Sequence, residues 1–325
     1  KTRTILSEEE IEKNIKNIKK ILKGFLDEDN SNTRPIFVNN YSWLKDLNYI
    51  SFLRDIGKHF TINKMLSFDS VKTRLEREQS LSYMEFNYMI LQAFDFLELN
   101  KKENCVLQMG GSDQWGNIVN GVDLIKRHSN KHAYGLTTPL ITLASGAKMG
   151  KTESGAVWLD KRFLSSYDYW QFWRNIDDRD VLKFLKIFTD LSIDEIEKVI
   201  QQNINQQKIV LANNATSLLH GDNEAKICEE TAKKTFSENS LGSGLPSVSI
   251  RTQNINEKIN IVDLIILSKL ENSKSEIKRL IKGNAVKINN EIIKDEKLII
   301  TKDFFKSNFL KLSLGKKRHV KVNLS

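Results

Sequence analysis

Residues 105–117 read C-V-L-Q-M-G-G-S-D-Q-W-G-N, and this segment decides the fold of the first half of the chain. The apolar run at residues 105–109 is typical of a buried parallel strand, and a helix is predicted over residues 114–127. Between them, Gly110 and Gly111 permit close backbone approach, while Asp113 and Gln114 supply polar groups. Open α/β sheets bind ligands where a helix begins beyond the carboxyl end of a strand. We therefore predict an α/β unit with a ligand crevice here; a plain tight turn is the alternative.

Helix starts are marked by Ser-x-x-Glu capping boxes, in which the serine and the glutamate each accept a backbone N–H of the other. Four occur, beginning at Ser7, Ser82, Ser192 and Ser273. The pattern after residue 158 is helical as far as residue 219, and a Ser/Gly/Asn-rich segment at residues 237–246 reads as a linker. Near the C-terminus we predict a helix over residues 261–267, a second helix after Ser273, and a hairpin that turns at Asn289-Asn290.

The composition bounds the class of protein. The chain has 325 residues, enough for two or three domains, and 40% of them are hydrophobic, too many for a disordered chain. No apolar run approaches the roughly 18 residues of a membrane span, which predicts a soluble protein without a membrane partner. The two cysteines, Cys105 and Cys228, read as reduced thiols in a buried strand or helix. The five histidines lack metal-ligand spacing, so we expect no metal site.

The positive charge is concentrated at one end. Net charge is +9, from 50 Lys and Arg against 41 Asp and Glu. Residues 274–325 contain 14 Lys and Arg and 5 Asp and Glu, so this segment accounts for the whole net positive charge of the chain. Lys274, Lys278 and Lys282 share one helix face, and Lys316, Lys317 and Arg318 extend the basic surface. Such a surface favours nucleic acid, whereas a solvated lysine-rich surface is the alternative.

Two further groups of residues have side chains suited to ligand binding or catalysis. Tyr88, Gln92 and Asp95 fall on one face of an otherwise apolar helix, where they either meet a ligand or simply face solvent. The segment S-G-A-K-M-G-K-T-E-S-G at residues 145–155 has the glycines of a mobile loop and the cations of a polyphosphate site in Lys148 and Lys151, with the Thr152 hydroxyl. A P-loop is excluded because residue 145 is Ser rather than Gly and no helix pattern follows.

Taken together, G-G-S-D-Q-W-G-N (110–117) and K-M-G-K-T-E-S-G (148–155) resemble signature segments of bacterial and organellar tyrosyl-tRNA synthetases, which are class I aminoacyl-tRNA synthetases; the second is similar to the family's KMSKS loop. F-L-R-D-I-G-K-H-F (52–60), the run 88–96 and N-I-D-D-R-D-V (175–181) support the resemblance. It implies an α/β fold: a Rossmann-like catalytic domain, partly present, then an α-helical domain and a small α+β RNA-binding domain. The expected divisions are residues 1–145, a KMSKS-type loop and connector at 146–165, an anticodon-recognition domain at 166–240, a linker at 241–258 and an S-four-like domain at 259–325.

The resemblance also implies a role for each matching residue. Tyr88 and Gln92 would hold the ammonium of the substrate tyrosine and Asp95 would accept its phenolic hydroxyl, while Gly110, Gly111, Asp113 and Gln114 would line the tyrosine and adenylate pocket. ATP, bound with Mg²⁺ as substrate, would meet catalytic or ATP-binding residues: Arg3, Lys148, Met149, Lys151 and Thr152. tRNA(Tyr) would meet a set of basic residues: Lys126, Arg127, Lys274, Lys278, Lys282, Lys316, Lys317 and Arg318. The helix with Tyr83 and Phe86 would lie near a homodimer interface.

One departure from the family pattern is that no HIGH motif occurs in the sequence. We expect an N-terminally truncated version of an active tyrosine–tRNA ligase, which would join L-tyrosine to the 3′ end of tRNA(Tyr) through tyrosyl-adenylate. A non-catalytic RNA-binding protein on a synthetase scaffold is the alternative. The expected location is the bacterial cytoplasm, with an organellar matrix as the alternative.

Overall fold

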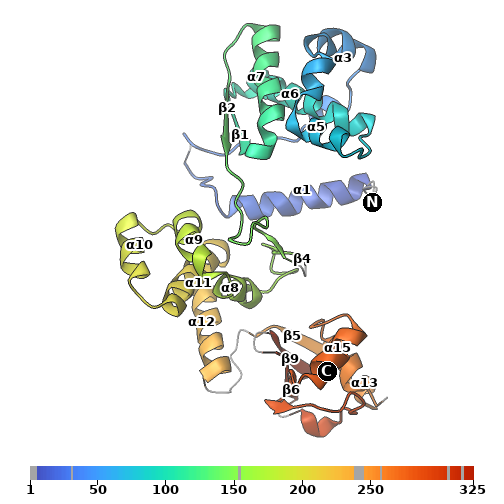
Figure 1. Ribbon diagram of the computed structural model, residues 1–325, viewed down its shortest axis with the longest axis vertical. Coiled ribbons are helices and arrows are strands. Elements are labelled where there is room, and N and C mark those ends of the chain that lie inside the picture. Colours follow the sequence, from blue (N-terminus) through green and yellow to red (C-terminus); the bar gives the residue numbers. More distant parts are fainter. Residues whose placement is uncertain are drawn as a thin grey trace. The chain divides into compact units, whose positions relative to one another are not determined.

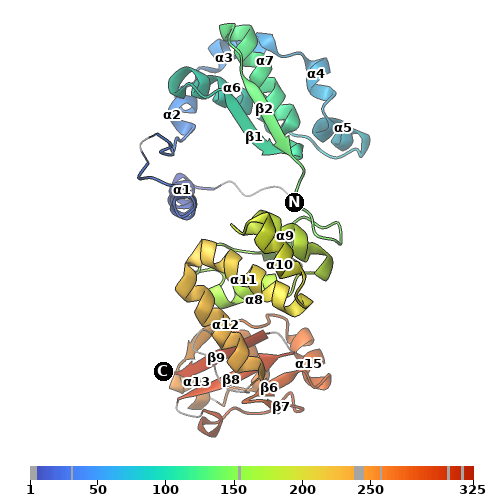
Figure 2. The same ribbon diagram turned by 90° about the vertical axis from the view of Figure 1, so that its left-hand side faces the viewer.

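The computed structural model describes residues 6–30, 32–152, 155–237, 245–256, 258–305, 308–315 and 318–325 (Figures 1 and 2). The chain forms two compact units, one of residues 35–149 and the other of residues 1–34 with 150–325. In the described parts, no helix has both the length and the apolar character that a membrane crossing requires. The predicted linker residues 238–244 lie outside the described residues.

The unit of residues 35–149 is built around a β–α–β element. Strands β1 (Leu107–Gly111) and β2 (Tyr134–Thr138) pair in parallel, with Leu107 opposite Tyr134. Helix α7 (Trp115–Ser129) connects them after a 3₁₀ turn, η2 (Ser112–Gln114). The predicted order of parallel strand, turn and helix is therefore confirmed, although β1 begins two residues later than expected. The strand is not buried as predicted: Leu107 and Met109 are 42% and 62% exposed.

The same unit contains six further helical segments: α2 (Tyr41–Leu44), α3 (Tyr49–Asp55), η1 (Gly57–His59), α4 (Ile62–Leu66), α5 (Asp69–Glu76) and α6 (Tyr83–Glu103). Helix α6 packs along α7, and Gly121 makes this approach possible, since a Cβ there would lie 2.9 Å from Cδ1 of Phe96. The core between them includes Ala93, Phe96, Leu97 and Leu124. This packing fixes the positions of the polar side chains on α6.

The predicted capping residues begin their helices. Ser7 opens α1 (Glu8–Lys23), Ser82 opens α6 and Ser192 opens α10 (Ile193–Ile200), each with both hydrogen bonds of the capping box. Ser273 opens α15 (Lys274–Lys282) and accepts the N–H of Glu276, the one cap bond found at that helix start. Local sequence therefore sets these four starts.

The middle of the chain is helical, as expected: α8 (Ser166–Arg174), η3 (Asp178–Asp180), α9 (Val181–Phe188), α10, α11 (Ile204–His220) and α12 (Asp222–Ser237). Its core is aromatic, with Trp173 and Phe188 ring centroids 4.9 Å apart and Phe184 fully buried. Before these helices, β3 (Lys151–Thr152) and β4 (Gly155–Ala156) pair antiparallel, so a strand stands where a P-loop would need a helix.

The C-terminal domain is a five-stranded sheet with helices on one face. The strand order is β5-β9-β8-β6-β7, and only the β5–β9 pair is parallel. The elements are β5 (Ser247–Ile250), α13 (Thr252–Asn256), α14 (Ile261–Leu267), α15, β6 (Val286–Ile288), β7 (Glu291–Ile292), η4 (Lys302–Phe304), β8 (Phe309–Leu314) and β9 (Arg318–Leu324). The predicted hairpin is confirmed, with φ of 50° at Asn289 and 74° at Asn290. Strand β5 belongs to this sheet, so the stretch expected to be a linker, 241–258, contains folded structure from Leu245 onward.

Candidate functional site

Asp95 on α6 is held by two side chains from the segment around α2. Its Oδ2 accepts a hydrogen bond from Asn40 Nδ2 at 3.0 Å, and its Oδ1 accepts one from Trp43 Nε1 at 2.8 Å. The indole is itself partly buried. The carboxylate is therefore fixed in direction, which a residue on a plain solvent face would not require. Sequence reasoning missed Asn40 and Trp43, because their pairing with Asp95 spans more than fifty residues.

Gln92 on α6 is joined to the start of α7 through Asn117. The Asn117 amide donates to Gln92 Oε1 at 3.0 Å and to Gln114 Oε1 at 3.3 Å. The predicted helix face and the predicted turn therefore meet at one place. Tyr88, by contrast, is 59% exposed and points away from the core. Asn117 belongs to the quoted motif and lies three residues after Gln114, a spacing that could have identified it.

The two glycines of β1 make room for neighbouring side chains. A Cβ on Gly111 would lie 2.8 Å from Leu140 Cδ2 and 2.9 Å from Asp113 Oδ1, and one on Gly110 would lie 3.1 Å from Gln114 Cβ. Asp113 itself is exposed. A side chain at either position would collide with these neighbours, so glycine is needed at the carboxyl end of the strand, and both the ligand crevice and the tight turn stay predictions.

The segment around Lys148 forms a hairpin-like turn. Met149 N–H donates to the carbonyl of Ile141 at 3.0 Å and Leu143 N–H to that of Ala147 at 2.8 Å, with Gly146 at φ 83° between them. Lys148 is exposed on this turn. The backbone of Lys151 and Thr152 lies in β3, whereas their side chains, and Arg3 as a whole, lie outside the described residues. Their predicted roles stay predictions.

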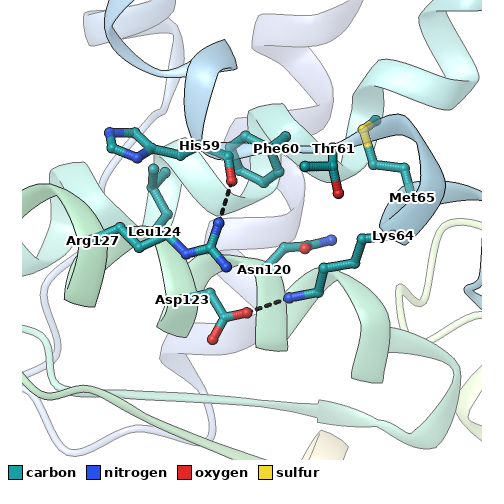
Figure 3. Close-up of a pocket in the computed structure, with 9 residues that line it drawn as sticks. All are labelled: His59, Phe60, Thr61, Lys64, Met65, Asn120, Asp123, Leu124 and Arg127. Carbon is teal, nitrogen blue, oxygen red and sulfur yellow. Dashed lines mark hydrogen bonds and ion pairs between the residues drawn. The ribbon is translucent and has the colours of Figure 1, made fainter.

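Lys126 and Arg127 lie in the last turn of α7, and Arg127 lines a small pocket (Figure 3). Lys126 is exposed, whereas Arg127 donates to the carbonyl of His59 at 2.8 Å. Lys64 and Asp123 form an ion pair across the pocket. The cavity of about 10 Å³ is water-sized, and the buried Asn120 Nδ2 lacks a hydrogen-bond partner there. This pocket is therefore too small for a substrate and fits one water molecule.

The predicted basic face of the C-terminal domain is largely paired with carboxylates. Lys274 lies 3.0 Å from Asp263 and Lys278 lies 3.2 Å from Glu296, while Arg318 pairs with Glu271 at 3.2 Å. Lys282 is exposed. Lys316 and Lys317 lie outside the described residues. Throughout the part of the chain that is described, no group of three His, Cys, Asp or Glu side chains is arranged to hold a metal ion.

Comparison with known proteins agrees with this geometry. Residues 1–237 match the family "tRNA synthetases class I (W and Y)", and residues 238–322 match the "Tyrosine--tRNA ligase SYY-like C-terminal domain". The tyrosine–tRNA ligase of Pelagibacter ubique (strain HTCC1062) is 77% identical over the whole chain, which covers 79% of that protein. The chain belongs to the class I tyrosine–tRNA ligases. The ligase of Agrobacterium fabrum is 49% identical over 98% of the chain and 78% of its own length.

Solved structures of this ligase family share the fold. A C-terminally truncated mitochondrial tyrosyl-tRNA synthetase of Aspergillus nidulans is 29% identical, with a TM-score of 0.60 over 73% of this chain and 71% of that one. The corresponding protein of Coccidioides posadasii is 28% identical, with a TM-score of 0.57 over 66% and 65%. The predicted fold class and family are confirmed. The matching relatives named here are all ligases, and none of them favours the non-catalytic alternative.

Proposed function

We propose that the polar cluster of α6 and α7 is the tyrosine site of this tyrosine–tRNA ligase. The observation that carries the proposal is the fixed carboxylate of Asp95, held by Asn40 and Trp43 in the same unit as the Gln92–Asn117–Gln114 bridge. A carboxylate whose direction is set by two donors can accept a hydrogen bond from a phenolic hydroxyl. Phenylalanine lacks that hydroxyl, so the site discriminates against it; large discrimination of this kind is a known property of the enzyme class.

Gln92 and Tyr88 lie on the same face of α6 as Asp95 and are assigned to the substrate ammonium. Asn117 Nδ2 donates to Gln92 Oε1 and so orients this amide, and the same oxygen has a second lone pair that can accept a hydrogen bond from the ammonium. Gly110, Gly111, Asp113 and Gln114 line the adenylate at the carboxyl end of β1. Helix α7 begins there, so its unpaired N–H groups favour anionic ligands.

In tyrosine activation, the tyrosine carboxylate oxygen attacks the α-phosphorus of ATP, which is bound with Mg²⁺. The new bond is oxygen to α-phosphorus, and the bond to the β-phosphate oxygen breaks as pyrophosphate leaves. Lys148, Met149, Lys151, Thr152 and Arg3 are assigned to the nucleotide. Lys148 is exposed on its turn and can supply positive charge to the departing phosphates, where charge develops most.

Transfer to tRNA(Tyr) follows, with the 3′-terminal hydroxyl attacking the adenylate carbonyl and AMP leaving. Lys126 is exposed at the end of α7 and is assigned to the acceptor stem with Arg127. Arg127 Nη1 already donates a hydrogen bond to the carbonyl of His59. We therefore assign Arg127 a general contribution of positive charge to tRNA binding, and not a direct hydrogen bond to the tRNA. The basic C-terminal residues are assigned to the rest of the tRNA.

An apolar patch supports the homodimer. The hydroxyls of Tyr49 on α3 and Tyr83 on α6 are 2.7 Å apart, and both helices carry exposed apolar side chains: Ile50 and Leu53 on α3, and Met84 on α6. Ile50 is 70% and Met84 75% exposed, which is unusual for side chains of this size. Sedimentation should give a dimer that I50E and M84E convert to monomer.

The bacterial relatives support a cytoplasmic location.

ATP–pyrophosphate exchange tests the proposed site. Exchange should depend on tyrosine and not on phenylalanine, and D95N should remove most of the preference while retaining the fold. The matched control is Asp46→Asn, since Asp46 is an exposed carboxylate before α3. Equal exchange with both amino acids would contradict the site, whereas tRNA binding without any exchange would favour the non-catalytic alternative.

A further inference from the structure

Lys102 lies over the ring of Trp43, the residue whose indole donates to Asp95. The Lys102 ammonium is 5.0 Å from the ring centroid, which is within the range of a cation–π contact. Lys102 belongs to the last turn of α6 and Trp43 to α2, and Figure 2 shows these two helices side by side. A charged side chain from the C-terminal end of α6 therefore contacts the residue that holds the Asp95 carboxylate.

A carboxylate holds Lys102 in this position. The Lys102 ammonium lies 3.1 Å from Glu98 Oε2, and the Glu98 side chain is only 13% exposed. Lys101 pairs with the other oxygen of the same carboxylate at 3.5 Å. Among the described residues, no aromatic ring lies beneath the Lys101 ammonium. The two neighbouring lysines thus share one anionic partner and differ in the contact with Trp43.

The hydrogen bond from Trp43 depends on how its ring is oriented. Trp43 Nε1 lies 2.8 Å from Asp95 Oδ1. The N–H bond of an indole lies in the plane of the ring, so a tilt of the ring turns the hydrogen away from the carboxylate and weakens the bond. Trp43 packs against the hydrophobic core of this unit, and the Lys102 ammonium lies over the ring. These two contacts together restrict the tilt.

The positive charge of Lys102 also strengthens the indole as a donor. Charged and hydrogen-bonded groups in series polarise one another, and here an ammonium, an indole and a carboxylate follow in that order. The ammonium attracts electron density towards the ring face, which makes the N–H a better donor to Asp95. Lys102 therefore acts on Asp95 both through geometry and through charge.

We propose that Lys102 is a positioning residue for tyrosine recognition, because it holds the Trp43 indole so that its N–H meets Asp95. The inference rests on the tyrosine site proposed above and adds to it a residue that acts through Trp43. Lys102 thereby favours tyrosine over phenylalanine, since only tyrosine has the hydroxyl that Asp95 can bind.

NMR of the indole N–H groups tests the geometry in the full chain and does not require activity. The chain has five tryptophans, and loss of one signal in W43F identifies that of Trp43. D95N then gives the position of this signal when the acceptor has lost its charge. K102M keeps the apolar stem and removes the ammonium, so it should move the Trp43 signal towards its position in D95N. K101M is the matched control and should leave the signal at its position in the parent chain.

Tyrosine binding and ATP–pyrophosphate exchange test the effect on recognition. K102M should raise the tyrosine KM and Kd about two- to fivefold, which is the size of a cation–π contact at a partly exposed site. The kcat should not change, and the response to phenylalanine should stay the same. K101M should match the parent chain. In a W43F background, K102M should have no further effect on the tyrosine KM, because the N–H that Lys102 positions is gone.

Three results would overturn the proposal: an unchanged Trp43 signal in K102M, equal effects of K101M and K102M on the tyrosine KM, or additive effects of K102M and W43F. Melting temperatures control for a purely structural role. Both lysine variants remove one cation from the last turn of α6, so their melting temperatures should agree. If the parent chain neither binds tyrosine nor supports exchange, the proposed tyrosine site fails, whereas the NMR comparison still decides whether Lys102 positions the indole.

Discussion

Replacing Trp43 by phenylalanine tests whether the indole hydrogen bond to Asp95 sets the affinity for tyrosine. The change keeps an aromatic ring in place and removes the N–H that lies 2.8 Å from Asp95 Oδ1. Hydrogen bonds to a charged group contribute about 1.5–3 kcal/mol. Asn40 still donates to the other oxygen at 3.0 Å, so we expect the lower end of this range, and about 1.4 kcal/mol corresponds to a tenfold loss of affinity.

The assay is the tyrosine KM in ATP–pyrophosphate exchange, together with the tyrosine Kd from equilibrium dialysis. W43F should raise both about tenfold, while the weak response to phenylalanine should not change, because that ligand makes no bond to Asp95. W158F is the matched control, since Trp158 is exposed and packs on Phe163. An unchanged KM for tyrosine, or an equal loss for both amino acids, would refute the reasoning.

Three further predictions follow from single contacts. G135A should destabilise the fold by about 1–3 kcal/mol in denaturant titration, because the new Cβ would lie 2.5 Å from Ile118 Cγ2; a cost under about 0.5 kcal/mol would show that β2 and α7 can separate freely. Iodoacetamide at pH 8 should label Cys105 at least tenfold faster than Cys228, because burial raises the Cys228 pKa to about 12, and mass spectrometry of peptides decides between them. A hydrogen bond from the Ser82 backbone, followed by one from Arg74, lowers the pKa of Glu85 to about 2. The ionised Glu85 carboxylate therefore stabilises the fold above pH 4.5, and this contribution is lost as the pH falls towards 2. E85Q should flatten the dependence of the melting temperature on pH in that window, and an unchanged profile would contradict this prediction.

Features that depend on neighbouring residues could be predicted from the sequence. Ser82 and its three counterparts mark helix starts because the cap bonds form within four residues. The Asn289-Asn290 turn follows from the tolerance of asparagine for positive φ. The order of strand, turn and helix at residues 105–129 follows from its apolar run and glycines.

At the start of β1, the C-terminal cap of α6 decides which residue begins the strand, although the apolar run begins two residues earlier. Asn104 ends α6 in the left-handed conformation, and Cys105 N–H donates back to the carbonyl of Leu99 at 3.2 Å. Asn100 Nδ2 then donates to the carbonyl of Cys105 at 2.9 Å. Both backbone groups of Cys105 are therefore occupied, so the residue precedes the strand instead of belonging to it, and the expectation that it lay in a buried strand was wrong.

The site network could not be predicted, because its partners are far apart in the chain. Helical spacing placed Gln92 and Asp95 on one face, but it did not show that Asn40 or Asn117 would meet them. Similarly, a count of lysines on α15 does not show that Asp263 from another helix neutralises Lys274. Tertiary contacts decide which polar groups are held and which charges are free.

The close fit of Gly121 against Phe96 has a consequence for the order of folding. The Gly121–Phe96 contact spans 25 residues and the β1–β2 pair Leu107–Tyr134 spans 27, so helix docking and strand pairing close loops of nearly equal length. Gln114 and Asn117 meet at the start of α7, and Gln92 reaches them when α6 docks on Gly121. Amide exchange should therefore protect α6, α7 and β1 together during refolding, and the tyrosine site should become competent in that same step.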